Sequence, residues 1–323
     1  MKVAVLGYGT VGKGVYDMLR TCPLLEAGPV LVRRGKADED FKCDSIESIC
    51  ADASIDAVAE TMGGVDTAYA YAAMALRAGK HFVTSNKALV AARGIELASL
   101  ARENGVGILF SAACGGAVPF LHNLELARES DEIVSLGGIL NGTTNYMLDM
   151  MQSEGLDYDA ALSDAQRLGY AEADPTADVS GLDALRKIML ACAVAYDMLP
   201  SDGLKNEGIE SLRAADVADL KRRGLCCRLV TKGGRNADGS VYAYVQPVLL
   251  TADAPECAVK KNFNMAKYHG KNSGDIVLMG QGAGRYPTAS AVLRDLECLA
   301  IGQREMLKKD CREVEANNDS CLC

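Results

Sequence analysis

The stretch VAVLGYGTVGKGV at residues 3–15 determines the expected fold of the first half of the chain. Gly7, Gly9 and Gly12 keep the GxGxxG spacing between an apolar strand and the start of an amphipathic helix. Gly7 permits a tight turn, Gly9 lets a pyrophosphate approach the backbone, and Gly12 lets strand and helix pack closely, while the helix N-terminus receives the phosphate charge. The alternative is a glycine-rich turn without a ligand. The context favours a dinucleotide site, with these expected contacts: Gly7, Gly9, Thr10, Val11 and Gly12.

Short apolar runs alternate with helical patterns through the rest of the first half. The clearest helical segments are residues 66–78 and 89–103, and the latter ends at an Asn-Gly pair typical of a helix C-cap. Strands interleaved with helices in this way indicate a parallel sheet covered on both faces. The predicted fold class is therefore α/β, with a Rossmann-type doubly wound sheet built from the runs 3–6, 30–32, 56–60, 81–84 and 106–112.

After about residue 130 the regular alternation of strand and helix patterns ends, which predicts a second, α+β domain. A strand at 132–140 precedes mostly helical sequence at 143–195, and two β-rich runs flank the turn RNADGS. A further short strand pair surrounds GKNSG at 270–274. The expected NAD(P)-binding domain spans residues 1–130, and the second domain spans 131–288. The last helix, at 289–310, is expected to pack back on the first domain, and the polar tail at 311–323 has a composition typical of disorder.

Composition narrows the possible partners and the compartment. The net charge of -9 leaves no basic excess for nucleic acid or an anionic membrane. No apolar run is long enough for a transmembrane helix or a signal peptide, so we expect a cytoplasmic protein. The twelve cysteines lack CxxC spacing, which indicates reduced structural thiols and no metal site. Three histidines, none at a metal-ligand spacing, disfavour a histidine-driven mechanism.

Basic residues follow two of the predicted strands. Arg33 and Arg34 occupy the place where NAD-specific sites carry an acidic residue. Guanidinium groups suit a 2′-phosphate, so the sequence favours NADP(H) over NAD(H), with two solvated arginines as the alternative. Lys87 follows the strand at 81–84, at the sheet edge where ligands bind. A surface lysine is the alternative, but its position favours a functional one.

The segment AQRLGYAEADPTADVSGLDALRKIML at residues 165–190 concentrates acidic side chains around one lysine. Asp183 and Lys187 stand four residues apart, on one face of a helix that follows Pro175. A capped surface helix with an ordinary ion pair would show the same spacing. The helix continues as IMLACAV, however, which is apolar on most sides and indicates burial, so the lysine is expected in a cleft.

With its neighbours, this segment resembles the signature of homoserine dehydrogenases. The further matching motifs are GYGTVGKGV, ETMGG at 60–64, SNKAL at 85–89, GGILNGTTNYML at 137–148 and GQGAGRYPTASAV at 280–292, so the resemblance covers nearly the whole chain. The signature positions that match are Ala165, Gly169, Tyr170, Ala171, Asp174, Pro175, Asp178, Val179, Gly181, Asp183 and Lys187.

The resemblance implies reversible, NAD(P)(H)-dependent interconversion of L-homoserine and L-aspartate 4-semialdehyde, a step in threonine, methionine and isoleucine biosynthesis. Lys187 is then the acid/base group, because a lysine ammonium stabilises an alkoxide and donates a proton to it. Lys87 would contact cofactor and reactants, and Asp183 would act beside Lys187. The implied substrate-binding residues are Glu172 for the amino group, Asp178, Tyr170 and Thr143.

The sequence departs from the family in two respects. Ser111 stands where relatives carry a glutamate of a monovalent-cation site, which makes that cation doubtful even though the carbonyl groups of Cys114, Gly116 and Val118 remain. The chain also ends after its last helix, as expected of a short form without the C-terminal regulatory ACT domain and its feedback inhibition by threonine.

Two other functions remain open from the sequence. Cys114 would be the nucleophile of a different semialdehyde dehydrogenase, although no histidine lies near it in sequence to activate it. A cofactor-binding sensor without catalysis is the other alternative, and the intact acidic signature argues against it. For the leading function we expect a homodimer formed through the sheet of the second domain.

Overall fold

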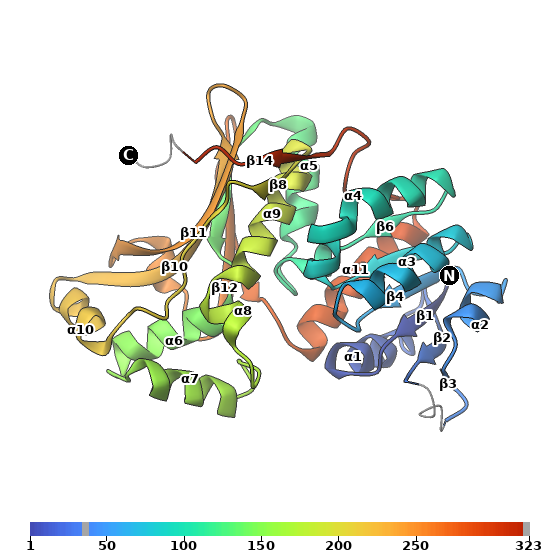
Figure 1. The fold of residues 1–323 in the computed structure, drawn as a ribbon, viewed down its shortest axis with the longest axis horizontal. Helices are drawn as coiled ribbons and strands as arrows, with labels where there is room; N and C mark the ends of the chain where they lie inside the picture. The colour runs from blue at the N-terminus through green and yellow to red at the C-terminus, as the bar shows by residue number, and fades with distance from the viewer. Residues whose placement is uncertain (34–38, 319–323) are drawn as a thin grey trace. The chain divides into compact units, whose positions relative to one another are not determined.

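The computed structural model describes residues 1–33 and 39–318, which form two compact units (Figure 1). Unit 1 comprises Met1–His122 and Ala283–Arg312, and unit 2 comprises Asn123–Gly282 and the chain from Glu313 onward. The first unit boundary thus lies within a helix near residue 122, instead of near 130. No helix in the described part of the chain is long and apolar enough to cross a membrane.

Unit 1 contains the predicted parallel sheet, with its six strands in the order β3-β2-β1-β4-β5-β6. Every pairing in it is parallel, and the order reverses between β1 and β4, where doubly wound sheets bind their ligands. The predicted Rossmann-type fold is confirmed. The strands are β1 (Lys2–Leu6), β2 (Glu26–Leu31), β3 (Lys42–Cys43), β4 (Ala57–Glu60), β5 (His81–Thr84) and β6 (Ile108–Leu109).

The helices of unit 1 pack in two pairs on this sheet. Helix α1 contacts α11, β1 and β2, whereas α3 contacts α4, β4 and β5. The α1–α11 contact is close, because a Cβ added to Gly14 would lie 2.8 Å from the Arg285 backbone oxygen. The helices are α1 (Thr10–Leu19), α2 (Ile46–Ala51), α3 (Asp66–Arg77), α4 (Lys87–Glu103), η1 (Ser111–Ala113), α5 (Phe120–Ser130), which crosses into unit 2, and α11 (Arg285–Ala300).

The strand expected at 106–112 is much shorter than the sequence indicates. Only two residues pair in β6, and a 3₁₀ turn begins at Ser111. The Ser111 amide donates to Asp295 Oδ2 of α11 at 2.7 Å, so a side chain takes the hydrogen bond that a longer strand would have given to its neighbour. The apolar pattern of this run reflects burial among helices as well as pairing.

Unit 2 is built on a six-stranded, mostly antiparallel sheet with the order β13-β12-β7-β10-β11-β9. Both predicted hairpins form, and they are longer than expected, because β10 pairs with β11 over eleven residues and β12 with β13 over eight. The strands are β7 (Ile133–Ile139), β9 (Lys205–Asn206), β10 (Leu225–Arg235), β11 (Val241–Thr251), β12 (Phe263–Gly270) and β13 (Gly274–Gln281).

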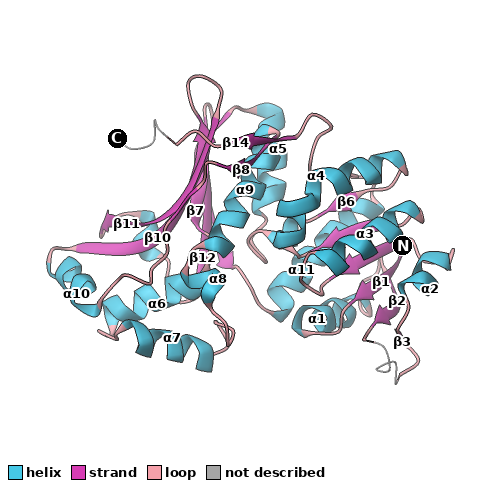
Figure 2. Cartoon of the chain, in the orientation of Figure 1, coloured by secondary structure: helices cyan, strands magenta, loops and turns pink. Residues whose placement is uncertain are grey.

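Helices cover one face of this sheet, and Figure 2 shows α9 running beside its strands. A Cβ at Gly233 of β10 would lie 2.6 Å from Cys192 Sγ of α9. Because side chains alternate along a strand, Lys232 points to the other face. The helices of unit 2 are α6 (Gly142–Ser153), α7 (Tyr158–Arg167), α8 (Thr176–Val179), α9 (Leu182–Tyr196), α10 (Ala214–Arg222) and η2 (Pro255–Ala258).

The face opposite α9 is partly open. On this face, Lys232 of β10 pairs with Gly137 of β7, which pairs with Lys267 of β12. Lys267 in turn pairs with Val277 of the edge strand β13. Val277 is 45% exposed, and Met279, two residues further along the same face, is 52% exposed. The η2 segment covers only one end, where Val259 packs on Ile139 and Met265.

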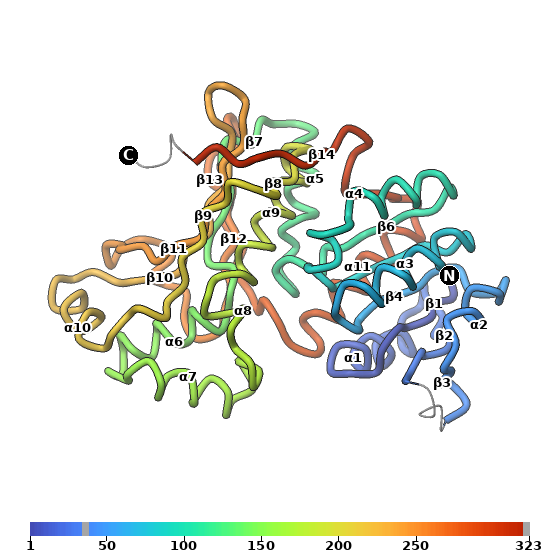
Figure 3. The backbone as a smooth tube through the Cα atoms, viewed as in Figure 1, coloured from blue at the N-terminus to red at the C-terminus, as the bar shows by residue number. Residues whose placement is uncertain are grey.

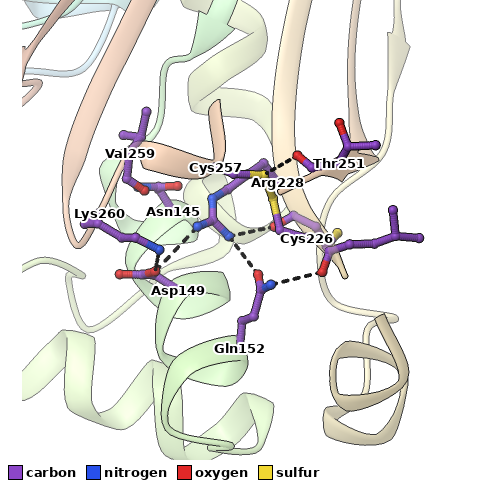
Figure 4. Close-up of a disulfide and its surroundings, with 11 residues drawn as sticks. Asn145, Asp149, Gln152, Cys226, Arg228, Thr251, Cys257, Val259 and Lys260 are labelled. Carbon is purple, nitrogen blue, oxygen red and sulfur yellow. Dashed lines mark hydrogen bonds and ion pairs between the residues drawn. A yellow bond between two sulfur atoms is a disulfide. The ribbon is translucent and has the colours of Figure 1, made fainter. Parts of the chain in front are cut away.

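A disulfide joins Cys226 of β10 to Cys257 of η2, which corrects the expectation that all cysteines are reduced (Figure 4). The two residues are 31 positions apart in sequence, and only the fold brings them together. Beside the disulfide, the buried guanidinium of Arg228 pairs with Asp149 of α6 at 3.4 Å. Burial lowers the pKa of Arg228, and the Asp149 carboxylate opposes that shift.

The end of the described chain is ordered, although its composition is typical of disorder. Strand β14 (Arg312–Glu315) pairs with β8 (Met198–Asp202), and the two run side by side in Figure 3. Asn318 then donates a side-chain hydrogen bond to the Gly203 carbonyl at 2.6 Å. Backbone pairing, which polar composition does not exclude, explains the difference from the predicted tail.

Candidate active site

The glycine loop of unit 1 has the geometry that close backbone approach requires. Gly7 has a φ of +97°, in the region that favours glycine. A Cβ at Gly12 would lie only 2.0 Å from the Gly7 carbonyl oxygen, so strand and helix could not stay in place with any larger residue. At Gly9, in contrast, nothing lies within 4 Å of the Cβ position. This exposed space lies at the N-terminus of α1 and fits a dinucleotide pyrophosphate.

Two side chains of the ETMGG motif, to which the sequence analysis gave no individual role, lie at and just after the end of β4. Thr61 donates to the Leu6 carbonyl at 2.9 Å. Glu60 is fully buried, and its carboxylate accepts hydrogen bonds from the Met62 amide at 2.6 Å and the Thr84 hydroxyl at 2.5 Å. The carboxylate thus connects the ends of β4 and β5. The sequence signal for this contact was an acidic residue at the end of an apolar strand, three residues before a Gly-Gly pair.

Lys87 lies where the sequence predicted it, as the half-buried first residue of α4 after β5. The preceding Asn86 caps the helix, because its side chain accepts the Leu89 amide at 3.1 Å. The same side chain donates to the Gly64 carbonyl at 2.5 Å. Asn86 therefore fixes the start of the helix that carries Lys87.

Of the two arginines predicted to contact the cofactor, the structure describes only the first. Arg33 is exposed just after β2, and Arg34 lies outside the described residues. A further cation stands nearby in sequence, on β3: the Lys42 ammonium lies 5.3 Å from the ring centre of Tyr8, which belongs to the glycine loop. Tyr16 of α1 stacks on Phe41 at 4.7 Å. These contacts place a lysine over the aromatic flank of the nucleotide loop.

In unit 2, Lys187 and Asp183 form the predicted pair on α9. The two atoms Lys187 Nζ and Asp183 Oδ2 are 2.7 Å apart, and both side chains are about nine-tenths buried. The ammonium also donates to the Leu140 carbonyl at 2.6 Å, just beyond the end of β7. Helix α9 is buried along most of its length, as expected from its apolar sequence.

Asp178 joins the same cluster through residues of α6. Thr143 Oγ1 lies 3.1 Å from Asp178 Oδ2, and Asn141 donates to Asp178 Oδ1 at 2.7 Å. Burial raises the pKa of Asp178, and the nearby Asp183 carboxylate adds to the increase, while the hydrogen bonds from Asn141 and Thr143 and the charge of Lys187 oppose it. The fold thus gathers a lysine and two carboxylates in one polar cluster. Asn141 was not predicted, although it lies in the NGTTN motif.

The side chains of Glu172 and Tyr170 do not take part in the hydrogen bonds described for the Lys187, Asp183 and Asp178 cluster. Glu172 is exposed, and among the described residues its carboxylate makes no hydrogen bond to the cluster. Tyr170 contributes its backbone carbonyl, which accepts from Thr143 at 2.6 Å, while its ring packs edge-on against Tyr146. Burial, with the hydrogen bond to Asp164 as a smaller cause, raises the pKa of Tyr146 to about 12.

Ser111 lies in a buried polar contact. Its hydroxyl donates to Asp295 Oδ1 at 2.5 Å, and His122 Nε2 lies 2.8 Å from the same oxygen. The Val118 carbonyl, one of the three expected cation ligands, accepts the Phe120 amide at 2.8 Å. Because the nearby carboxylate is directed at Ser111 and His122, the loop offers a cation only carbonyl oxygens. No step of the reaction is assigned to a cation at this loop.

Cys114 is fully buried in this loop of small residues. A nucleophile has to reach its substrate, so this burial disfavours the alternative of a thioester mechanism. Each of the three histidines has a partner of its own: His81 accepts the Gly107 amide, His122 pairs with Asp295, and His269 pairs with Asp275.

Comparison with known proteins agrees with both units. The chain matches the family model "Homoserine dehydrogenase" over residues 119–296 and "Homoserine dehydrogenase, NAD binding domain" over 7–111. It is 37% identical to a homoserine dehydrogenase of Synechocystis sp., covering 92% of this chain and 72% of that protein. A crystal structure of a homoserine dehydrogenase from Thiobacillus denitrificans matches with a TM-score of 0.90 and 30% identity, covering 98% of this chain and 79% of that one.

A second solved structure is relevant to the cofactor. It is a hyperthermophilic archaeal homoserine dehydrogenase in complex with NADPH, with a TM-score of 0.79 and 25% identity. The match covers 93% of this chain and 97% of that one.

Proposed function

The chain belongs to the homoserine dehydrogenase family, and from this premise we propose which of its residues carry the reaction. It is an NAD(P)-dependent oxidoreductase that acts on the hydroxyl group of homoserine, with aspartate 4-semialdehyde as the other reactant, in amino-acid biosynthesis. The observation that carries the proposal is the buried pair of Lys187 and Asp183 beside Asp178. We place the enzyme in the cytoplasm, because its reactants are intracellular metabolites; fractionation that recovers the activity outside the cytoplasm would contradict this.

Lys187 is the acid/base group of this proposal. A bound nicotinamide cofactor supplies the hydride for aldehyde reduction. The resulting alkoxide needs a proton and a positive charge nearby, and a positioned ammonium provides both. The Leu140 carbonyl and Asp183 carboxylate each accept a hydrogen bond from Lys187, which fixes the direction of its Nζ. Asp183 is thus catalytic through its direct contact with the reacting lysine.

The remaining polar residues bind the two reactants. Asp178 and Glu172 carry the negative charge that an amino-acid ammonium requires, and Thr143 and Tyr170 complete the substrate contacts. In unit 1 the dinucleotide would be held by residues of the glycine loop, the end of β2 and the start of α4: Gly7, Gly9, Thr10, Val11, Gly12, Arg33, Arg34 and Lys87. Lys87 would contact both the cofactor and the reactants.

We further propose a preference for NADP(H). Two arginines follow β2, where a 2′-phosphate lies in NADP-specific sites. Initial rates with NADPH should exceed those with NADH at equal subsaturating concentration. Arg33→Ala should raise the KM for NADPH about tenfold, the effect of losing one charge-assisted hydrogen bond, and leave the KM for NADH unchanged. Higher rates with NADH in the wild type would contradict the proposal.

We also propose that the enzyme is a homodimer formed through the open face of the unit 2 sheet. Val277 and Met279 are exposed on this face, and large exposed apolar side chains that gather on one surface mark interaction sites. Met279→Asp should convert the dimer to a monomer in analytical ultracentrifugation, because a charge placed in an apolar interface must be desolvated. Leu126→Asp is the control, since Leu126 is 72% exposed on α5. A monomeric wild type, or a dimeric Met279→Asp variant, would refute this interface.

A further inference from the structure

The junction between β7 and α6 holds the polar cluster together, and two consecutive residues do so. The Leu140 carbonyl accepts hydrogen bonds from Lys187 at 2.6 Å and from the Asn264 side chain at 3.0 Å. The next residue, Asn141, is 3% exposed and caps α6. Both residues are therefore fixed in place by secondary structure on each side.

The side chain of Asn141 reaches two carboxylates at once. Its Nδ2 lies 2.7 Å from Asp178 Oδ1 and 2.9 Å from Asp183 Oδ2. An amide nitrogen has two hydrogens, so each carboxylate receives one. The orientation of the amide is determined by its other end, because Oδ1 accepts the Thr144 amide at 2.8 Å and a flipped side chain would turn a donor towards a donor.

The two carboxylates need such a group. Asp178 is half-buried, Asp183 is 9% exposed, and the Asp183 charge opposes the ionisation of Asp178. Lys187 neutralises Asp183 directly, whereas Asp178 accepts a hydrogen bond from Asn141 and lies 3.1 Å from the Thr143 hydroxyl, whose single hydrogen is shared with the Tyr170 carbonyl. Asn141 is thus the side chain that donates to both carboxylates.

We propose that Asn141 is a positioning residue that holds the Asp178 carboxyl group in place for the substrate amino group while it fixes Asp183 beside Lys187. This role rests on the proposed assignment of Asp178 to substrate binding and of Lys187 to acid/base catalysis. A donor with two hydrogens is required, so neither serine nor aspartate can replace asparagine here, although both cap helices well.

Steady-state kinetics of Asn141→Ser across pH tests the proposal, because serine keeps the helix cap but lacks the amide nitrogen that donates to both carboxylates. We expect kcat/KM for homoserine to fall about 10- to 100-fold, as for lost hydrogen bonds to charged groups, with the KM for the cofactor unchanged. The acid limb of the kcat/KM profile should move to higher pH, because the Asn141 hydrogen bond lowers the pKa of Asp178. Without it, burial and the Asp183 charge raise this pKa further, and only Thr143 and Lys187 still lower it. Asn141→Asp, which has the same shape, should lose more, since a carboxylate adds a third negative charge.

Asp157→Ser is the matched control, because Asp157 caps α7 in the same way, accepts the Ala160 amide at 2.8 Å, and is exposed. It should leave kcat/KM and the pH profile unchanged. Wild-type kcat/KM in Asn141→Ser, or a loss without movement of the acid limb, would overturn the proposal. If Asn141→Ser does not fold, Asn141→Thr, which also caps helices and adds no charge, answers the same question by the same criteria. Failure of the underlying site assignment is distinct, because Lys187→Ala would then keep its activity.

Discussion

Lys187→Ala should lower kcat for homoserine oxidation by about 1,000-fold or more, because one side chain supplies both general acid/base catalysis and electrostatic stabilisation of the alkoxide. The NADPH dissociation constant, measured by fluorescence titration, should stay within about twofold of the wild type, since the residues assigned to cofactor binding do not include Lys187. Removing the lysine also leaves Asp183 buried without its cation, which costs stability. Assays should therefore be run well below the measured melting temperature.

Lys271→Ala provides the matched control for this variant. Lys271 forms an ion pair with Glu132 at 2.8 Å, a distance similar to that between Lys187 and Asp183. The side chains of Lys271 and Glu132, however, are both about two-thirds exposed. Exposed pairs contribute little, so turnover and stability should stay near those of the wild type. Lys187→Met, which keeps the side-chain volume, distinguishes loss of the amino group from loss of packing. A full rate in either Lys187 variant would remove this residue from the mechanism.

Gly9→Ala should weaken dinucleotide binding about 10- to 100-fold without affecting the fold. The free protein has room for the methyl group, because nothing lies within 4 Å of that position, and the φ of -80° suits alanine. The methyl group would occupy the space through which the pyrophosphate approaches the backbone. Binding is measured by titration with NADPH, and folding by the thermal midpoint.

Gly12→Ala should instead reduce both binding and thermal stability. Its Cβ would lie 2.0 Å from the Gly7 carbonyl oxygen, so the loop has to move even in the free protein. Overpacking of this kind costs about 1–3 kcal/mol. Wild-type NADPH affinity in Gly9→Ala would show that the pyrophosphate does not lie over this position.

Features encoded over short stretches of sequence were predicted well. The glycine loop, the alternation of strands and helices, and the i,i+4 pair of Asp183 and Lys187 all appear in the structure as expected. Each depends on residues a few positions apart, where spacing alone sets geometry. The family was predicted from motifs of the same kind and is confirmed by the comparisons.

The fold's long-range contacts were not predicted. The disulfide of Cys226 and Cys257, and the contact between Ser111 and Asp295, join segments that only the packing of strands and helices brings together. The strand predicted at 106–112 was also too long, because apolar periodicity does not distinguish pairing in a sheet from burial among helices.

The sequence by itself determined the class of cofactor, the fold of unit 1 and the family, because glycine spacing and the acidic signature act locally. The tertiary structure alone decided how the charges of the candidate site are stabilised. Asn141 lies 37 residues from Asp178 and 42 from Asp183, and Glu60 lies 24 from Thr84. Such contacts depend on which strand ends are neighbours, and strand order depends on the packing of the whole unit, which no local pattern encodes.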